Sequence, residues 1–235
     1  MTQEEKNQLL AKAQNFFRRR IVPSHFSNTK KLRDYKELNV NPFLLKYLSQ
    51  FAFGDSSPEN MAKALIYPRV LGTSITTSFG THIQYFCNDV LSAYVSKEEG
   101  IDIEFDDALD GRHKYCQIKA GPVTINRNDI TVIKNKFYRF KDSAKEEGRT
   151  IDDDDCIIGV FYGNLYDLCK HYLSIHDEYH VYIGKYFWQH LTGDPDFYDA
   201  LISTFAEVAS EMDCTALLDD ILRITAKHLE KEMGK

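Results

Sequence analysis

Two short segments that alternate apolar and polar residues, 101–105 and 113–120, constrain the fold most, because they are typical of the paired strands of a β-hairpin. Asp110-Gly111, between them, is a dipeptide that favours a tight two-residue turn. Further along, Cys156 to Tyr162 is a continuous apolar run, the pattern of a strand buried on both faces, and Tyr179 to Ile183 adds another short strand. The sequence therefore predicts a sheet that begins with a hairpin.

The predicted turn fixes which residues of the hairpin face one another. With Asp110-Gly111 as the two central residues, Asp102 lies opposite Lys119, and Glu104 lies opposite Gln117. Side chains alternate across a strand, so these four polar residues share one face of the sheet. The apolar residues between them take the other face and enter the core. A slip of the register by one residue on a longer loop would break this arrangement.

Helices are predicted on both sides of the strands from capping residues and apolar periodicity. The N-terminal helix should stop at Arg18-Arg19-Arg20, before Pro23, and the helix that opens at Ser57-Pro58 should stop at Pro68. The predicted helices cover about residues 2–17, 43–51, 58–67, 78–95, 129–147, 185–191, 196–212 and 214–232. This order of elements predicts an α/β core of four or five strands with a helical N-terminal region.

The size and charge of the chain narrow its class. Its 235 residues suit a single domain, with 1–72 as a helical N-terminal region, 73–193 as the α/β core and 194–235 as C-terminal helices. No stretch approaches the roughly 20 continuous apolar residues that span a membrane, and residues 1–6 lack the features of a signal peptide. We therefore expect a cytoplasmic protein without a membrane partner. The net charge of −6 argues against non-specific coating of nucleic acid, but not against binding a short site in a cleft.

The polar face of the hairpin carries groups suited to metal-assisted hydrolysis of a phosphodiester. Asp102 would hold Mg²⁺ through a carboxylate oxygen, and Gln117 and the main-chain carbonyl of Ile118 would offer further oxygen ligands. Lys119 would orient or deprotonate the attacking water, and Glu104 could supply a second carboxylate. The alternative is a hairpin whose polar face is merely solvated, because short alternating hairpins with mixed charges are common.

The spacing Asp-(x)14-Gln-x-Lys, from Asp102 to Lys119, resembles the PD-(D/E)xK motif of restriction endonucleases and related nucleases. Further blocks, which run in the same order along residues 40 to 190, resemble the restriction enzymes that cut GGNCC-type sites. These blocks are Asn41-Pro42-Phe43, Pro68-Arg69-Val70-Leu71-Gly72, Ile118-Lys119-Ala120-Gly121 with Thr124-Ile125, Gly159-Val160-Phe161-Tyr162-Gly163-Asn164, and His180-Val181-Tyr182-Ile183-Gly184-Lys185 with Phe187-Trp188.

The resemblance implies a type II restriction endonuclease with a restriction-endonuclease-like α/β core, a mixed four- to five-stranded sheet flanked by helices. It implies Mg²⁺ as the cofactor, double-stranded DNA as the substrate and a homodimer that suits a palindromic site. It also implies a cognate DNA methyltransferase in the cell, with no direct contact expected. Asp102 takes the place of the family's first metal-binding acid and Lys119 that of its lysine. Two features depart from the pattern: Ile101 precedes Asp102 in place of proline, and Gln117 replaces the usual Asp or Glu.

A polar segment after Lys119 carries candidate DNA contacts. Thr124, Asn126, Arg127 and Asn128 offer donors to phosphates and base edges at the start of a predicted helix. Arg69, beside a proline, is a further candidate. The alternative for the first group is a plain helix cap with solvated neighbours. The basic residues of the helix that follows form a stripe that faces solvent or phosphate; they are Lys134, Lys136, Arg139 and Lys141.

Three other features bear on the chemistry. Gln84 precedes the hairpin on a predicted helix, where related nucleases often project an acidic side chain, and it could be the counterpart of that group. The run Asp152 to Asp155 lacks the glycine and terminal glutamate of a calcium loop, and we interpret it as a solvated turn. The histidines show no HExxH spacing, which argues against zinc catalysis.

Three readings compete with a restriction enzyme. One is another PD-(D/E)xK nuclease, such as a repair or mobile-element enzyme, which would not cut at one fixed sequence. The second is a non-catalytic DNA-binding module that keeps the hairpin as a scaffold and would not depend on Lys119. The third is an α/β interaction protein without affinity for DNA, which the ordered family blocks disfavour.

Overall fold

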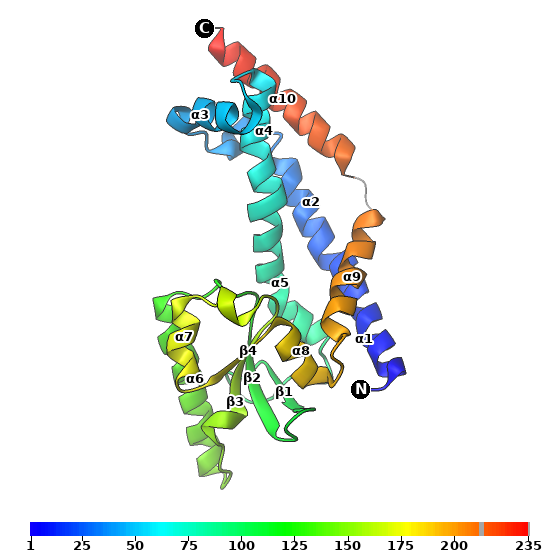
Figure 1. The fold of residues 1–235 in the computed structure, drawn as a ribbon, viewed down its shortest axis with the longest axis vertical. Helices are drawn as coiled ribbons and strands as arrows, with labels where there is room; N and C mark the ends of the chain where they lie inside the picture. Colours follow the sequence, from blue (N-terminus) through cyan, green and yellow to red (C-terminus); the bar gives the residue numbers. More distant parts are fainter. Residues whose placement is uncertain (212–213, 235) are drawn as a thin grey trace. The chain divides into compact units, whose positions relative to one another are not determined.

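The computed structural model describes residues 1–211 and 214–234 (Figure 1). Its strands are β1 (Ile103–Asp106), β2 (His113–Lys119), β3 (Cys156–Val160) and β4 (His180–Ile183). Its α-helices are α1 (Gln3–Phe16), α2 (Val22–Lys31), α3 (Pro42–Phe53), α4 (Pro58–Pro68), α5 (Ile75–Asp89), α6 (Arg127–Glu146), α7 (Lys170–His176), α8 (Gly184–Thr192), α9 (Phe197–Ser210) and α10 (Thr215–Met233). Short helical turns join some of them: η1 (Phe17–Ile21), η2 (Tyr35–Leu38), η3 (Arg69–Ser74), η4 (Asp153–Asp155) and η5 (Leu165–Asp167).

The chain divides into two compact units. The α/β unit consists of residues 1–16 and 80–207, and the helical unit of residues 17–79 with the described part of 208–235. The helices expected at the two ends of the sequence are thus shared between the units, since α1 belongs to the α/β unit and α10 to the helical unit. The single domain expected from chain length stays a prediction. No helix of the described residues has the length and apolar character needed to cross a bilayer.

The sheet of the α/β unit confirms the predicted α/β class. In the described residues it has four strands in the order β1-β2-β3-β4, with β1 antiparallel to β2 and the other neighbours parallel. It is therefore the mixed sheet that the family resemblance implied. Every residue of β3 is buried, as its continuous apolar run predicts.

Helices cover both faces of the sheet, with α6 and α7 on one side and α8 on the other (Figure 1). On the α6 side, Phe137 and Tyr172 pack against the apolar residues of β3 and β4. On the α8 side, Trp188 lies against Phe161 with ring centroids 4.8 Å apart. A Cβ on Gly159 would meet the Phe187 ring at 2.5 Å, so this strand position admits only glycine beneath α8. Because both faces are covered, two polar residues of β2, Lys114 and Gln117, are buried.

The hairpin register differs from the prediction by two residues. Ile103 pairs with Cys116 and Glu104 with Tyr115, so the register places Asp102 opposite Gln117 rather than Lys119. The predicted opposition of Glu104 and Gln117 is wrong for the same reason. A shift of two residues keeps each side chain on its face, so the polar residues still share one face of the sheet.

The shift arises in the turn, which is a four-residue loop, 108–111, and not the predicted two-residue turn. The Asp107 N–H donates to the Arg112 carbonyl at 2.9 Å, and the Gly111 N–H donates to the Asp107 carbonyl at 2.8 Å. The Asp107 side chain is 2% exposed and accepts the Leu109 N–H at 2.9 Å. Burial of Asp107 therefore sets where the strands separate, and Asp110-Gly111 form the second half of a longer loop.

Two predicted helix ends are also wrong. The first helix does not stop at Arg18-Arg19-Arg20, because η1 continues it directly into α2. Pro23 lies in the first turn of α2, where a missing N–H costs no helical hydrogen bond. In the same way α4 includes Pro68 and continues through η3 into α5. Proline is a weak stop signal where the helix can widen into a π-turn that leaves one carbonyl free.

The helical unit is built from apolar residues of α3, α4 and α10, with Leu32, Leu38 and Val70 from the segments between helices, and these form two small clusters around Ile66 and Ala62. The predicted cap of α3 is confirmed, since the Asn41 side chain accepts the Phe43 N–H at 3.1 Å. Ser57 caps α4 in the same way. Helix α3 buries only Leu45 and Ser49, so most of its apolar residues remain on the surface.

Candidate active site

Asp102 lies just before β1 and is held from two directions. Its Oδ2 accepts the main-chain N–H of Ile118 at 2.7 Å, and its Oδ1 accepts Nε2 of Gln84 at 3.3 Å. Gln84 comes from α5, the helix that precedes the hairpin, and its contact with Asp102 is where the family resemblance placed a supporting side chain. The carboxylate is therefore fixed against the end of β2 by one strand and one helix.

Gln117 is fully buried between the sheet and α6. Its Nε2 donates to the main-chain carbonyl of Ile133 at 3.1 Å. Its Oε1 is buried and has no hydrogen-bond partner among the described residues. A buried polar atom without a partner costs about 1–3 kcal/mol, so an oxygen in this state is a candidate ligand for a cation. The solvated polar face considered from the sequence is wrong for this residue, since 0% of Gln117 is exposed.

The main chain of β2 adds a further oxygen on the Asp102 side. In a strand, the N–H and C=O of one residue point to the same neighbouring strand, and the next residue points the other way. Lys119 faces β3, because its carbonyl accepts the Phe161 N–H at 2.9 Å. Ile118 faces the β1 side, where its N–H bonds Asp102. Since β1 begins at Ile103, opposite Cys116, the Ile118 carbonyl projects past the start of β1.

Lys119 ends β2 and is mostly buried. Burial lowers its pKa, the nearby Asp102 carboxylate opposes that effect, and the Lys136 ammonium adds to it. No ion pair to Lys119 occurs among the described residues. Its ammonium and the Asp102 carboxylate therefore interact only through space. A buried lysine with a lowered pKa is suited to charge stabilisation and proton transfer.

Glu104 shares the face of Asp102 but is engaged elsewhere. Its Oε1 accepts a hydrogen bond from the Ser96 hydroxyl, and its Oε2 lies 3.3 Å from Nε2 of His113. His113 lies toward the hairpin loop, Ser96 lies in the segment that runs along the outer side of β1, and the strand residue opposite Glu104 is Tyr115. The structure thus brings Asp102, Gln117 and Lys119 together and leaves Glu104 bound to a separate pair of residues. Its role as a second carboxylate stays a prediction.

The candidate DNA contacts lie in two different units. Asn126 caps α6, because its side chain accepts the N–H groups of Asn128 and Asp129 at 2.8 and 3.4 Å. Thr124 donates to the Gly121 carbonyl at 2.8 Å and so braces the loop after β2. Arg127 and Asn128 are exposed at the start of α6. Arg69 belongs to the helical unit, where its Nη1 donates to the Leu38 carbonyl at 3.3 Å.

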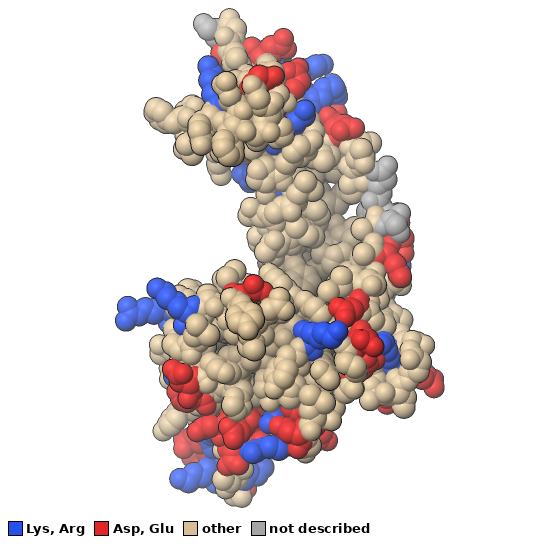
Figure 2. Space-filling model, in the orientation of Figure 1, with Lys and Arg blue, Asp and Glu red and all other residues tan. Residues whose placement is uncertain are grey.

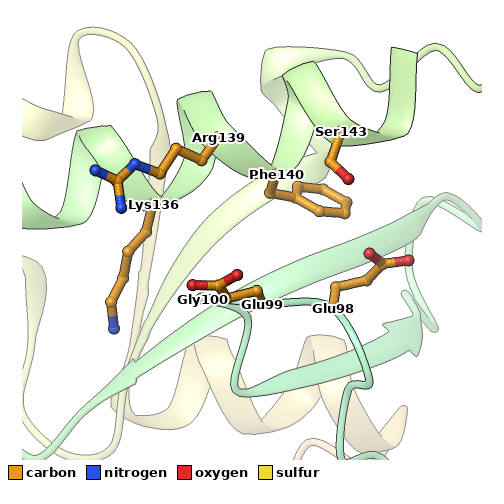
Figure 3. A pocket seen from close by; sticks show the side chains of 7 residues that line it. All are labelled: Glu98, Glu99, Gly100, Lys136, Arg139, Phe140 and Ser143. Carbon is orange, nitrogen blue, oxygen red and sulfur yellow. The ribbon is translucent and has the colours of Figure 1, made fainter. Parts of the chain in front are cut away.

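The basic residues of α6 do not form one free stripe. Lys134 pairs with Glu178 at 2.5 Å, and Lys141 pairs with Asp153. Figure 3 shows Lys136 and Arg139 on α6 above a pocket whose opposite wall is the loop with Glu98, Glu99 and Gly100. Lys136 therefore lies beside this acidic loop, and its ammonium also repels that of Lys119 through space.

The loop end of the hairpin buries a second polar group that the sequence analysis missed. The Asp107 carboxylate lies 2.6 and 2.7 Å from Nδ1 of His190, a residue of α8, and both side chains are buried. Lys114 is 1% exposed, and its Nζ bonds Asp110 at 2.8 Å and the Asp154 carbonyl at 3.1 Å. Asp107 and His190 are 83 residues apart and Lys114 and Asp154 are 40 apart, so no direct signal in the sequence pointed to these contacts. Lys114 and Asp110 are four residues apart, in and beside the acid-rich loop.

A comparison with known protein families identifies the chain. The model of the type II restriction endonuclease EcoO109I family matches residues 4–213, which is most of the sequence. The chain belongs to this family. The enzyme is therefore a site-specific deoxyribonuclease, a DNA-binding hydrolase of a restriction-modification system. A search of curated proteins found no match.

Proposed function

We propose that this restriction endonuclease hydrolyses phosphodiester bonds of double-stranded DNA at a short palindromic, GGNCC-like site, with Mg²⁺, as a homodimer acting in the cytoplasm. One observation carries the catalytic part: the buried Oε1 of Gln117 has no hydrogen-bond partner in the described part of the chain and lies on the same sheet face as Asp102 and Lys119. The preference for a GGNCC-like site rests on the sequence blocks shared with enzymes of that specificity. A cognate methyltransferase would protect the same site in the host's DNA.

The residues at this site fit Mg²⁺. The cation prefers oxygen ligands and keeps several waters, so it needs few protein groups. Asp102 offers a carboxylate, Gln117 an amide oxygen, and Ile118 a main-chain carbonyl on the same side of β2. Among the described residues no three His, Cys, Asp or Glu side chains are grouped to hold a metal. A site with one carboxylate would therefore depend on the neutral oxygens of Gln117 and Ile118.

Asp102 and Lys119 would have different roles in hydrolysis. When bound, Mg²⁺ supplies positive charge to the scissile phosphate and lowers the pKa of a water that it holds. Asp102 is held by Gln84 and the Ile118 N–H and would present its carboxylate to the cation in this orientation. Lys119 would orient the attacking water, accept its proton when neutral, and offset the charge that develops on phosphorus oxygens. Burial lowers the pKa of Lys119, which increases its neutral fraction at a given pH.

Incubation of the protein with unmodified phage DNA tests this proposal. We expect discrete fragments with Mg²⁺ and none with EDTA, and loss of cutting in the Lys119→Met and Asp102→Asn variants. Lys134→Met is the matched control, because Lys134 is a lysine of the same unit held by a surface ion pair. Sequencing of the fragment ends gives the site and the overhang. Intact DNA in every lane with a folded protein, or random fragments, would contradict the proposal.

The helical unit supports the dimer. Helix α3 exposes a continuous apolar stripe in which Phe43 is 90%, Tyr47 61% and Phe51 78% exposed, with Leu44 and Leu48 beside them. Figure 2 shows uncharged atoms over this helix, and its one charged residue is Lys46. With roughly 150–250 Å² for an aromatic side chain, the exposed fractions of Phe43, Tyr47 and Phe51 correspond to about 340–570 Å², a large part of the ~800 Å² that each partner gives to a standard interface. A second copy of α3 offers the same apolar surface.

Sedimentation velocity tests the dimer and this surface together. We expect the wild-type enzyme to be a dimer and the double variant Phe43→Glu, Phe51→Glu to be a monomer, because two charges in the contact would each lose their hydration. Tyr138→Glu is the control, since Tyr138 is a 66% exposed aromatic residue of α6. A monomeric wild type, or a double variant that still dimerises, would contradict the proposal.

A further inference from the structure

Two loops leave the sheet at the edge where β2 and β3 end, and they are tied to each other. The Cys169 N–H donates to the Pro122 carbonyl at 3.0 Å, and the Tyr172 hydroxyl donates to the Gly121 carbonyl at 3.1 Å. A Cβ on Gly121 would lie 2.5 Å from the Tyr162 hydroxyl, so the tyrosine ring packs directly on the loop after Lys119. The two loops therefore form one braced surface next to the candidate active site.

This braced surface exposes apolar side chains. Val123 from the first loop is 69% exposed, and Leu165 and Tyr166 from the second are 56% and 100% exposed. We call these three residues the loop ridge. The tip that carries Leu165 and Tyr166 is held in a single turn by Asn164 and Asp167, since the Asn164 N–H donates to the Asp167 carboxylate at 2.8 Å. Because the turn fixes the backbone that carries Tyr166, binding a partner through this side chain costs little backbone conformational freedom.

The loop ridge lies in a part of the chain with little net charge. Segments 120–129 and 161–170 together contain two basic residues, Arg127 and Lys170, and two acidic residues, Asp129 and Asp167, so their net charge is 0 in a chain of net charge −6. Both carboxylates are engaged in turns, Asp129 by the Asn126 N–H and Asp167 by Asn164. Apolar tips with basic groups beside them are a combination that proteins use to contact bases while the basic groups hold the backbone.

We propose that the loop ridge contacts base pairs beside the scissile phosphate, and that Tyr166 inserts against a base step of the bound duplex. The proposal rests on the proposed function, because it takes Lys119 and Asp102 to mark the scissile phosphate. Lys119 ends β2, and Phe161, which bonds the Lys119 carbonyl, opens the loop that carries Tyr166. Insertion unstacks a step, so the enzyme discriminates among sequences by how easily that step deforms, in addition to any base-edge hydrogen bonds.

Fluorescence of a duplex that carries the enzyme's site, with 2-aminopurine placed singly at positions around the cut, tests the inference. Binding is measured in Ca²⁺, which allows binding without cutting in this design. We expect increased 2-aminopurine emission at one step with wild-type enzyme and with Tyr166→Phe, because the ring and not the hydroxyl stacks. Tyr166→Ala should lose that signal and bind about 10- to 100-fold more weakly, the range for loss of one aromatic stacking contact.

Tyr138→Ala is the matched control, since it removes another exposed tyrosine of the same unit. Wild-type enzyme that cuts at its site, with a Tyr166→Ala variant that gives the same affinity and the same emission, would overturn this inference alone. A Tyr166→Ala variant with altered oligomeric state and unchanged DNA affinity would also overturn it, because the ridge would then bind protein. A wild-type chain that neither binds nor cuts DNA would overturn the proposed function as well.

Discussion

The two ends of the β1–β2 hairpin bury polar groups in opposite ways. The loop end is rich in carboxylates, and its buried charged side chains are paired: Asp107 lies against His190, and Lys114 against Asp110. One buried atom there, Nε2 of His190, has no hydrogen-bond partner among the described residues. Among the described residues, the open end holds the carboxylate of Asp102 together with a lysine that has no ion pair and an amide oxygen that has no hydrogen bond. A count of acidic residues would favour a metal at the loop end, whereas our proposal puts it at the open end, where oxygen ligands have fewer partners.

From this difference we expect the loop end of the hairpin to contribute mainly to stability and the open end mainly to catalysis. Paired buried charges hold the native geometry, and removing one partner leaves the other uncompensated. Unpaired buried groups destabilise the free protein and become useful when a ligand supplies the missing interaction. We therefore expect substitutions at the loop end to change the free energy of unfolding, and substitutions at the open end to change activity.

The largest contrast is expected between two buried lysines of the same strand. Lys119→Met should reduce the rate of DNA cleavage by about 10²- to 10⁴-fold, the usual contribution of a positioned acid–base group, without lowering the urea midpoint of unfolding. Lys114→Met should lower that midpoint and leave cleavage per folded molecule unchanged, because Asp110 loses its partner. Equal losses of activity in the two variants at equal stability would remove the distinction between the two ends.

Asp107→Ala tests the loop end more severely. The change leaves His190 buried without its carboxylate and removes the acceptor of the Leu109 N–H. Breaking a buried pair costs about 3–5 kcal/mol, which equilibrium unfolding in urea would measure. The matched change Asp102→Ala should cost less stability and abolish cleavage. A stable, inactive Asp107→Ala variant would show that the loop end has a catalytic role.

The sequence predicted the shared polar face of the hairpin but not its register. The predicted face is correct because a two-residue shift preserves the alternation of side chains. The register is not, because the turn depends on Asp107 and on His190, 83 residues away. The burial of Gln117 could not be predicted from the sequence either, since it depends on the packing of α6 over the sheet. Local signals located the strands and the caps at Asn41 and Ser57, because each acts within a few residues or one element. Gln84 was singled out by the family resemblance, since its contact with Asp102 crosses from a helix to the hairpin.

Gln117→Glu tests the open end of the hairpin by strengthening a proposed ligand instead of removing one. A carboxylate at this position is a stronger ligand for Mg²⁺ than an amide, and it restores the acid that the PD-(D/E)xK pattern carries here. We expect cleavage to reach half its maximal rate at an Mg²⁺ concentration about 10-fold lower than in the wild type. Gln117→Met, which fills a similar volume without an oxygen, is the control and should need more Mg²⁺. The same Mg²⁺ dependence in all three proteins would contradict a role of Gln117 as a ligand.

The smallest effect is expected at His113. Burial lowers the pKa of His113, but its contacts with Asp106 and Glu104 outweigh that and leave the pKa above its ordinary value. A raised pKa in the folded state contributes stability that is present below the ordinary histidine pKa, near 6.5, and that is lost as the pH rises through the raised value. The urea midpoint of wild-type protein should therefore fall more between pH 6 and pH 8 than that of His113→Gln. Parallel profiles would contradict this.

The position of the metal tests the central claim most directly. Fe²⁺ with ascorbate, substituted for Mg²⁺ in the complex with DNA, produces radicals that cut the polypeptide near the bound cation, and mass spectrometry locates the cuts. We expect cuts beside Asp102 and within Gln117 to Lys119 in the wild-type enzyme, and no cuts at these places in the Asp102→Asn variant. Cuts confined to the loop end, around Asp107 to Asp110 or Asp152 to Asp155, would contradict it, since the paired carboxylates would then hold the metal.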